Sequence, residues 1–251
     1  MFTESNQNQV QDASIGPTAE REAEEFVSYL SSSRQDLLAA MNEPARFQSL
    51  LETIADLRVE RVLDVGCGIG QMLYPFVAIK GAFGVGLDPA HQACLMGHEF
   101  YATHVPSARI RFIYGRAETL PFASASFDIV NCGLALPYMD NASALEEIAR
   151  VLRPGGILLL KIHHARYYLR DFWRGLISRR LLQMVHAGRV LAVGAIYHLT
   201  GSQPDTRLIG NETFQTRWLL RRELSRRGFY IERERTDSNP QTPAFLISKE
   251  R

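Results

Sequence analysis

The sequence predicts an α/β fold of the Rossmann-like type, with a doubly wound and mostly parallel sheet. Val62, Leu63 and Val65 have the branched, apolar side chains of a strand that is covered on both faces, and the acid Asp64 interrupts them. This strand leads directly into a glycine-rich turn, Gly66 to Gly70, where glycine permits backbone conformations closed to other residues. A second strand pattern, Gly84 to Asp88, also ends in an acid. Because the chain after Gln71 reads as helix, we expect helices to alternate with these strands.

Two acids at the ends of these strands predict a ligand. A carboxylate next to the interior is costly unless it meets donors, so we expect Asp64 to be held by backbone amides of the turn and by a positive ligand group. Asp88 is placed to accept hydrogen bonds from two ribose hydroxyls. A dinucleotide fingerprint requires Gly-x-Gly-x-x-Gly, but here Gln71 stands where the third glycine should be, which disfavours NAD. A helix after Gln71 would place the ligand at a helix N-terminus.

Four ordered stretches carry a resemblance to a known family. They are Asp64 to Gly70, then Asp88, then Ala117 to Phe122 followed by Phe127 to Val130, and finally Leu152 to Gly156 before the apolar run Ile157 to Leu160. On these motifs the chain resembles a class I S-adenosylmethionine-dependent methyltransferase, of the small-molecule type related to quinone-biosynthesis C-methyltransferases. The resemblance implies a seven-stranded sheet of order 3-2-1-4-5-7-6, with an antiparallel last strand and helices on both faces.

The resemblance also implies where S-adenosylmethionine would bind. The glycine-rich turn would lie against the methionine part, with Asp64 near its ammonium group, while Asp88 would hold the ribose and Leu87 or Pro89 would flank the adenine. Many relatives have an acid or amide before the Ala-Glu pair, but this chain has Arg116, which has donors only and is expected to point away. The cofactor-binding residues implied in this way are Asp64, Gly66, Cys67, Gly68, Gly70, Asp88, Pro89, Ala117, Glu118, Asn131, Cys132 and Gly133.

Composition and length favour a single methyltransferase domain. The chain has 251 residues, 46% of them hydrophobic, and a net charge of +1, which argues against a general nucleic-acid binder. We expect a mobile polar tail over 1–20 that lacks the features of a secretion signal, followed by one domain over 21–251. Within it we expect N-terminal helices (21–60), a cofactor-binding core (61–164), a helical insert (165–212) and a last helix with a β-hairpin (213–251).

The three cysteines, Cys67, Cys94 and Cys132, have no paired metal-ligand spacing. We therefore expect no metal site, and reduced thiols in a cytoplasmic protein, where they act as small apolar filler.

The N-terminal region predicts two or three helices between Ala19 and Leu57, interrupted at Pro44. These helices could close over the cofactor. Arg34 and Arg46 are candidates to pair with the methionine carboxylate, the alternative being solvated positions on a helix surface.

The insert from Ala165 to Gly210 predicts two apolar helices. Between Ala165 and Thr200 six arginines stand against the single acid Asp171, which gives a local charge of +5. This pattern is compatible with a lid over a hydrophobic or anionic substrate, with a peripheral membrane contact, or with a helix pair packed on its own domain or on a second subunit in a homodimer. No stretch reaches the ~18 uncharged apolar residues of a spanning helix.

The end of the chain predicts a helix and a β-hairpin. The helix should run from Glu212 to Arg227, capped by Asn211 and stopped at Gly228. Two strands, Phe229 to Thr236 and Ala244 to Ser248, should follow it. The predicted buried side of the helix comprises Phe214, Trp218, Leu219 and Leu224.

The methyl acceptor should be a small molecule with an oxygen, nitrogen or activated carbon nucleophile, aligned for in-line displacement. If a base is needed, His163 and His164 stand near the expected substrate mouth, and at most one should face it because consecutive strand residues point to opposite faces. Tyr138 is a further candidate for orienting the acceptor.

Three other functions compete with this one. A lipid-linked or quinone-like acceptor at a membrane surface would suit the arginine-rich insert. A non-catalytic cofactor-binding or scaffolding protein would show damage in the first motif, which is intact. Methylation of RNA or DNA is disfavoured because Asn131-Cys132-Gly133-Leu134 stands where Asn-Pro-Pro-Tyr or Asp-Pro-Pro-Tyr would be expected.

Overall fold

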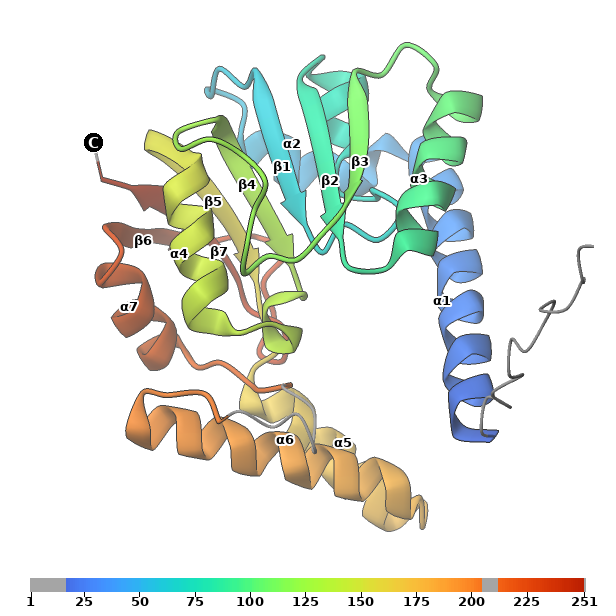
Figure 1. The fold of residues 1–251 in the computed structure, drawn as a ribbon, viewed down its shortest axis with the longest axis vertical. Coiled ribbons are helices and arrows are strands. Elements are labelled where there is room, and N and C mark those ends of the chain that lie inside the picture. Colours follow the sequence, from blue (N-terminus) through green and yellow to red (C-terminus); the bar gives the residue numbers. More distant parts are fainter. Residues whose placement is uncertain (1–16, 205–211, 251) are drawn as a thin grey trace, which may run out of the picture.

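A seven-stranded sheet forms the centre of the molecule in a computed structural model that describes residues 17–204 and 212–250, with side chains from residue 26 onward. The strand order is β3-β2-β1-β4-β5-β7-β6, and only the pairs that include β7 are antiparallel (Figure 1). This order confirms the predicted fold class. The strands are β1 (Arg61–Val65), β2 (Phe83–Asp88), β3 (Ile110–Tyr114), β4 (Phe127–Gly133), β5 (Leu152–Lys161), β6 (Phe229–Glu234) and β7 (Ala244–Lys249).

Helices cover both faces of the sheet, because alternate residues of the central strands enter two different cores. Leu63 and Val130 face a core shared with α4 and α7, whereas Val62 and Ile129 face one shared with α2 and a short π-helix, η2. A third cluster packs α1 against α3 at the β3 side of the sheet. The helices are α1 (Pro17–Asn42), α2 (Gln48–Thr53), η2 (Pro75–Ile79), α3 (His91–His104), α4 (Asn141–Val151), α5 (Ala165–Ile177), α6 (Leu181–Thr200) and α7 (Arg217–Ser225).

The N-terminal region contains the helices that the sequence predicts, with an interruption at Pro44. A 3₁₀ helix, Pro44–Phe47, separates α1 from α2. Helix α1 begins at Pro17 and so includes the last four residues of the polar tail predicted over 1–20, and residues 1–16 lie outside the described range.

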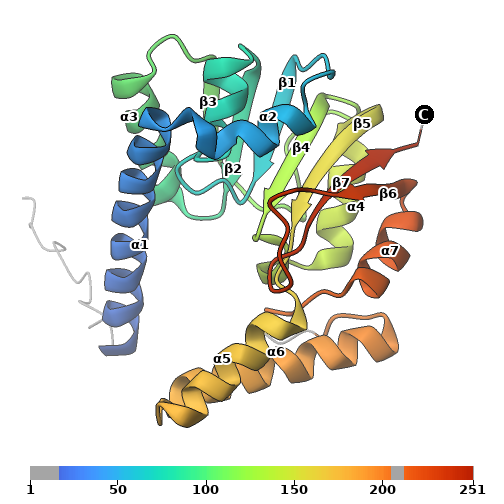
Figure 2. The same ribbon diagram turned by 180° about the vertical axis from the view of Figure 1, so that it is seen from behind.

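The insert forms an antiparallel helix pair, α5 and α6, which extends away from the sheet as a separate arm (Figures 1 and 2). Its two backbones approach closely near the turn, where a Cβ on Gly175 would stand 2.9 Å from the backbone nitrogen of Met184. Phe214 fixes the other end of α6, since its ring lies 2.3 Å from the position of a Cβ on Gly194. Within the described residues no helix has the length and apolar character needed to cross a bilayer.

The last helix starts later than the sequence predicts. Thr216 caps α7 by accepting a hydrogen bond from the backbone nitrogen of Leu219, and the predicted cap, Asn211, lies outside the described residues. The preceding segment is extended, because Gln215 donates its backbone N–H to the carbonyl of His163. Trp218 was predicted on the buried side of α7 but is 60% exposed, and its ring stacks under the guanidinium of Arg222.

Candidate cofactor and acceptor site

The glycine-rich turn lies at the end of β1 and requires its glycines. Gly66, Gly68 and Gly70 have φ values of 71°, 54° and 90°, in the left-handed region that glycine adopts most readily. A Cβ on Gly66 would also stand 2.3 Å from the Cβ of Ala135, which follows β4. The turn therefore brings bare backbone to the ends of β1 and β4.

The turn amides do not hold Asp64, contrary to the sequence prediction. The backbone nitrogens of Gly66 and Cys67 both donate to the carbonyl of Leu87, at 2.8 and 3.2 Å. These bonds tie the turn to the end of β2. The partner of Asp64 is instead the side-chain amide of Asn131, at 2.6 Å from Oδ1.

The predicted helix directly after Gln71 is also wrong. The chain passes through successive turns before the π-helix η2 begins at Pro75. Proline has no backbone N–H and is favoured at the first position of a helix, which explains why the helical segment begins there. The glycine-rich turn therefore supplies its own amides and carbonyls to the site, without the N-terminus of a regular helix behind it.

Asp64 is a buried acid with an unusual proton affinity. Its side chain is 2% exposed. Burial raises the pKa of Asp64 to about 7; the hydrogen bond from Asn131 opposes this rise, and the nearby charge of Asp88 adds to it. Near neutral pH this carboxyl group is therefore partly protonated, and a cation placed beside it would drive the proton off.

Asp88 binds backbone with both of its oxygens. Oδ2 accepts from the backbone nitrogen of Gly68 at 2.8 Å, and Oδ1 accepts from that of Ala90 at 2.9 Å. A carboxylate oxygen can accept about two hydrogen bonds, so each oxygen retains capacity for a hydroxyl group. Of the two residues expected to flank adenine, Leu87 is buried in the core and Pro89 is exposed, which leaves Pro89 for that position.

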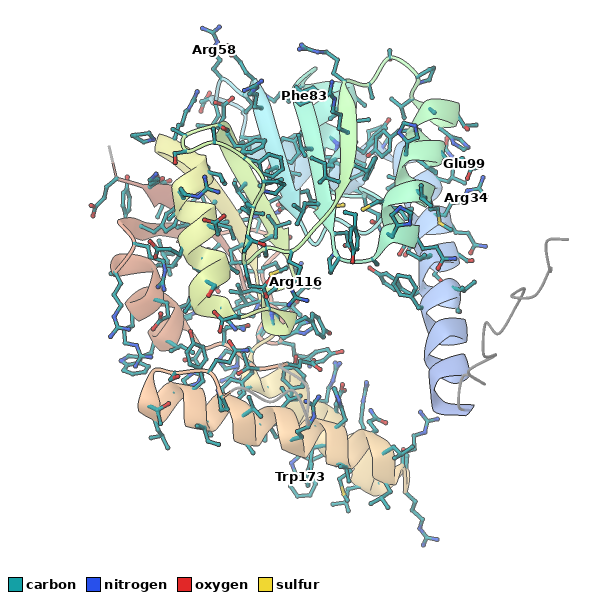
Figure 3. All side chains as sticks on the ribbon, viewed as in Figure 1. Arg34, Arg58, Phe83, Glu99, Arg116 and Trp173 are labelled. Carbon is teal, nitrogen blue, oxygen red and sulfur yellow. The ribbon has the colours of Figure 1, made fainter. Side chains whose placement is uncertain are left out.

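The segment after β3 carries Arg116 on its surface. The exposed guanidinium lies 3.3 Å from Oε1 of Glu118, an oxygen that also accepts from the backbone nitrogen of Asp140 at 3.1 Å. Arg116 lies in the loop in front of β4 and β5 in Figure 3. The side chain of Ala117 is buried in the core.

The thiols next to the turn are neutral and enclosed. Cys67 and Cys132 are buried, and burial raises the pKa of the Cys132 thiol to about 12 and that of Cys67 well above its usual range. Cys94 is also buried, with a raised pKa. These values agree with the prediction of small apolar filler. Gly133 ends β4 next to Cys132 and is half-buried.

Helix α1 reaches the turn through a residue that the sequence analysis did not single out. The hydroxyl of Tyr29 lies 3.7 Å from the position of a Cβ on Gly68. The two predicted carboxylate partners lie elsewhere. Arg34 projects beside Glu99 of α3 (Figure 3), and Arg46 pairs with Glu43 at 3.0 Å.

His163, two residues after the end of β5, is one end of a buried hydrogen-bonded chain that runs through Tyr168 to Glu212. Its ring stacks on that of Tyr167 at 4.4 Å, and its Nδ1 lies 3.1 Å from the hydroxyl of Tyr168. That hydroxyl donates to Oε1 of Glu212 at 2.7 Å. Because a phenol has one proton and gives it to the carboxylate, it must accept from Nδ1–H of His163. The unprotonated nitrogen of the imidazole is then Nε2, since burial lowers the pKa of His163 to about 4 and keeps the ring neutral at pH 7.

The other two candidates lie on either side of His163. Tyr138 is half-exposed, with its ring 6.3 Å from that of His163, and burial together with Glu212 raises its pKa. His164 caps α5 and lines a different, open pocket of about 550 Å³ with Arg217 and Arg235. The two histidines therefore lie on opposite sides of the chain.

Tyr29, Tyr168 and Glu212 were missed as site residues. Tyr167 and Tyr168 were assigned to an apolar helix, although an aromatic pair four and five residues after His163 is a usable signal. Glu212 lies far from His163 in the sequence, and only the fold brings them together.

This architecture defines the class of the protein. A parallel sheet closed by an antiparallel hairpin, with a glycine-rich turn after the first strand and an acid after the second, is that of a class I S-adenosylmethionine-dependent methyltransferase. Residues 63–160 match the model of the methyltransferase domain family. These residues therefore form a methyltransferase domain.

Known proteins resemble the chain over this core. It is 33% identical over 110 residues to the O-methyltransferase rstn1 of Aspergillus nomiae, covering 43% of this chain and 49% of that protein. It is 31% identical over 114 residues to the ubiquinone/menaquinone biosynthesis C-methyltransferase UbiE of Dinoroseobacter shibae, covering 45% and 46%. The chain thus spans about half the length of these curated relatives.

Among solved structures, the fold is similar to magnesium protoporphyrin IX methyltransferase (ChlM) of Synechocystis PCC 6803 with bound S-adenosylhomocysteine. The TM-score is 0.55 at 16% identity, over 87% of this chain and 84% of that one.

Proposed function

We propose that the protein transfers a methyl group from S-adenosylmethionine to a small molecule by in-line displacement. The observation that carries this proposal is the arrangement of Asp64 and Asp88 at the ends of adjacent strands, on either side of the glycine-rich turn. A sulfonium methyl group is already activated, so the protein mainly has to align the nucleophile opposite sulfur.

The cofactor would span both acids. Its ammonium group would neutralise Asp64, and its ribose hydroxyls would use the remaining acceptor capacity of Asp88. Pro89 would flank the adenine and Glu118 would accept from the adenine amino group, while the end of β4 from Asn131 to Gly133 would lie beneath the sulfonium.

The base for an acidic acceptor would be His163. Its Nε2 is the nitrogen left unprotonated by the bond to Tyr168, so it can accept a proton from a hydroxyl or an enolisable carbon. Glu212 would stabilise the cationic ring that forms during transfer, acting through the hydroxyl of Tyr168 that lies between them. The names of the relatives include both O- and C-methyltransferases, which supports a small-molecule acceptor and leaves its atom open.

Calorimetric titration tests the cofactor assignment. Wild type should bind S-adenosylmethionine and S-adenosylhomocysteine but not NAD. Asp88→Ala should weaken binding by about 2 to 4 kcal/mol, the value of one or two charge-assisted hydrogen bonds. Asp36→Ala, an exposed acid on α1, is the matched control and should bind as wild type does. Unchanged affinity in folded Asp88→Ala protein would refute the ribose assignment.

A non-catalytic cofactor-binding role is the alternative from another class. Such a protein would bind S-adenosylmethionine and never form S-adenosylhomocysteine with any acceptor, including catechols and hydroquinones. The complete set of motif residues argues against this alternative.

A further inference from the structure

The turn between α5 and α6 exposes an unusual set of apolar side chains. We call residues 173–182 the hairpin tip. Its five large apolar side chains are at least about half exposed: Trp173 (57%), Leu176 (48%), Ile177 (80%), Leu181 (65%) and Leu182 (77%). Trp173 projects away from the sheet in Figure 3. Contiguous apolar surface of this kind marks a place where a protein or a membrane binds.

The hairpin tip is held in this shape by its own backbone. The backbone nitrogen of Arg180 donates to the carbonyl of Gly175 at 2.8 Å, and Arg179 takes a left-handed conformation with φ 54°. Gly175 also lets the two helices touch at the turn, as described above. The apolar side chains therefore point outward because the turn is tight, and they cannot fold back between the helices.

Positive charge surrounds these side chains. Arg174, Arg179 and Arg180 are all exposed, and the sequence contains no acid between Phe172 and Pro204. Within the part of the chain that the structure describes, none of the three is in an ion pair with a carboxylate. Exposed apolar side chains flanked by arginines without carboxylate partners match the interface of an anionic bilayer, where acyl chains lie beneath negatively charged headgroups.

We infer that the hairpin tip inserts its apolar side chains into the interfacial layer of an anionic membrane, with the three arginines on lipid phosphates. A second copy of the chain fits this surface less well, because a two-fold dimer through the tip would bring the same arginines of both copies together.

This placement has a consequence for the acceptor, and that consequence rests on the proposed function. Tyr167 lies near the start of α5, about 15 Å along the helix from Ile177 at 1.5 Å per residue, and it stacks on His163, which lies two residues before the helix. An acceptor with a lipid tail could remain in the membrane while its reactive head reaches His163. Binding of the membrane by the tip does not itself depend on methyl transfer.

Co-sedimentation with lipid vesicles tests the inference. The full chain should sediment with vesicles of phosphatidylcholine and phosphatidylglycerol, and much less with phosphatidylcholine alone. The triple variant Ile177→Gln, Leu181→Gln, Leu182→Gln should reduce the partition coefficient at least about tenfold. Arg174→Gln with Arg180→Gln should reduce it about fivefold per arginine and remove the preference for anionic lipid.

The control variant changes apolar residues elsewhere that are also more than half exposed. Leu95→Gln with Tyr230→Gln changes side chains that are 56% and 52% exposed on α3 and β6, and it should sediment as wild type does. Absence of vesicle binding by wild type, or an equal loss in the control, would overturn the inference. So would light scattering that shows a dimer abolished by the triple variant, because a second copy would then cover the tip. Calorimetry with S-adenosylmethionine on every variant separates these outcomes from failure of the cofactor site.

Discussion

Binding of S-adenosylmethionine at pH 6.5 should release most of a proton from Asp64. With its pKa at about 7, roughly three quarters of this carboxyl group is protonated at pH 6.5 in the free protein. An ammonium group within contact distance lowers the pKa of a carboxylate by about 1 to 3 units. A fall of two or three units leaves Asp64 almost fully ionised, so about 0.7 proton should leave per cofactor bound.

Calorimetry in several buffers measures this number. The apparent binding enthalpy changes with the ionisation enthalpy of the buffer, and the slope is the number of protons exchanged. At pH 6.5 the amino group of the cofactor is already charged, since free α-amino groups have a pKa near 8, so it contributes little to the slope. Asp64→Asn should bind with a slope near zero.

His163→Gln serves as the control. Because the pKa of His163 is about 4, its ring is neutral at pH 6.5 and its loss should leave proton release unchanged. A wild-type enthalpy independent of the buffer, or an unchanged slope in Asp64→Asn, would refute the placement of the ammonium group beside Asp64.

Three further predictions concern the turn and the acceptor site. Gly66→Ala should destabilise the fold by more than about 2 kcal/mol in urea unfolding and abolish cofactor binding, because the new Cβ would lie 2.3 Å from the methyl carbon of Ala135. Gly81→Ala is the control: Gly81 has a similar φ of 69° but nothing within 4 Å, so this variant should lose only the cost of backbone strain, about 1 kcal/mol. Folding lowers the pKa of His163 from 6.5 to about 4, so between these pH values the unfolded chain binds a proton that the folded protein does not. The free energy of unfolding should therefore fall by at most about 3 kcal/mol as the pH drops from about 6.5 to about 4. His163→Gln should lose less stability over this range, and equal losses would contradict the burial of a neutral ring. Tyr168→Phe removes the phenol that donates to the carboxylate of Glu212, so it should lower the free energy of unfolding by about 1.5 to 3 kcal/mol and leave cofactor binding unchanged. Once an acceptor is known, this variant should also lower kcat more than it changes KM and alter the pH–rate profile.

The parts of the fold that follow local rules could be predicted from the sequence. The strands β1 and β2 were recognised because their residues alternate between two buried faces and end at glycines and acids. The glycines at 66, 68 and 70 were recognised because their conformation is restricted by sterics within a few residues. Sheet order came from the family resemblance, since strand pairing depends on residues far apart in the chain.

Long-range contacts explain the misses. Residues 212–216 have a helical pattern, but Gln215 bonds to His163 after β5, and this pairing delays the start of α7. Trp218 has the spacing of a buried residue, yet it is 60% exposed and packs against Arg222, one turn further along the same helix, which is a local exception to this rule. The partner of Asp64 is on β4, 67 residues away, so the local turn amides were the wrong guess.

One carboxylate links the two halves of the candidate cofactor site. Asp88 holds the amide of Gly68 while its other acceptor positions face the expected ribose, so the turn and the ribose position share one hydrogen-bonded unit. Fragments of the cofactor should therefore not bind independently: adenosine, by fixing Asp88, should order the glycine-rich turn and strengthen binding of methionine. By linkage, methionine should strengthen binding of adenosine by the same factor.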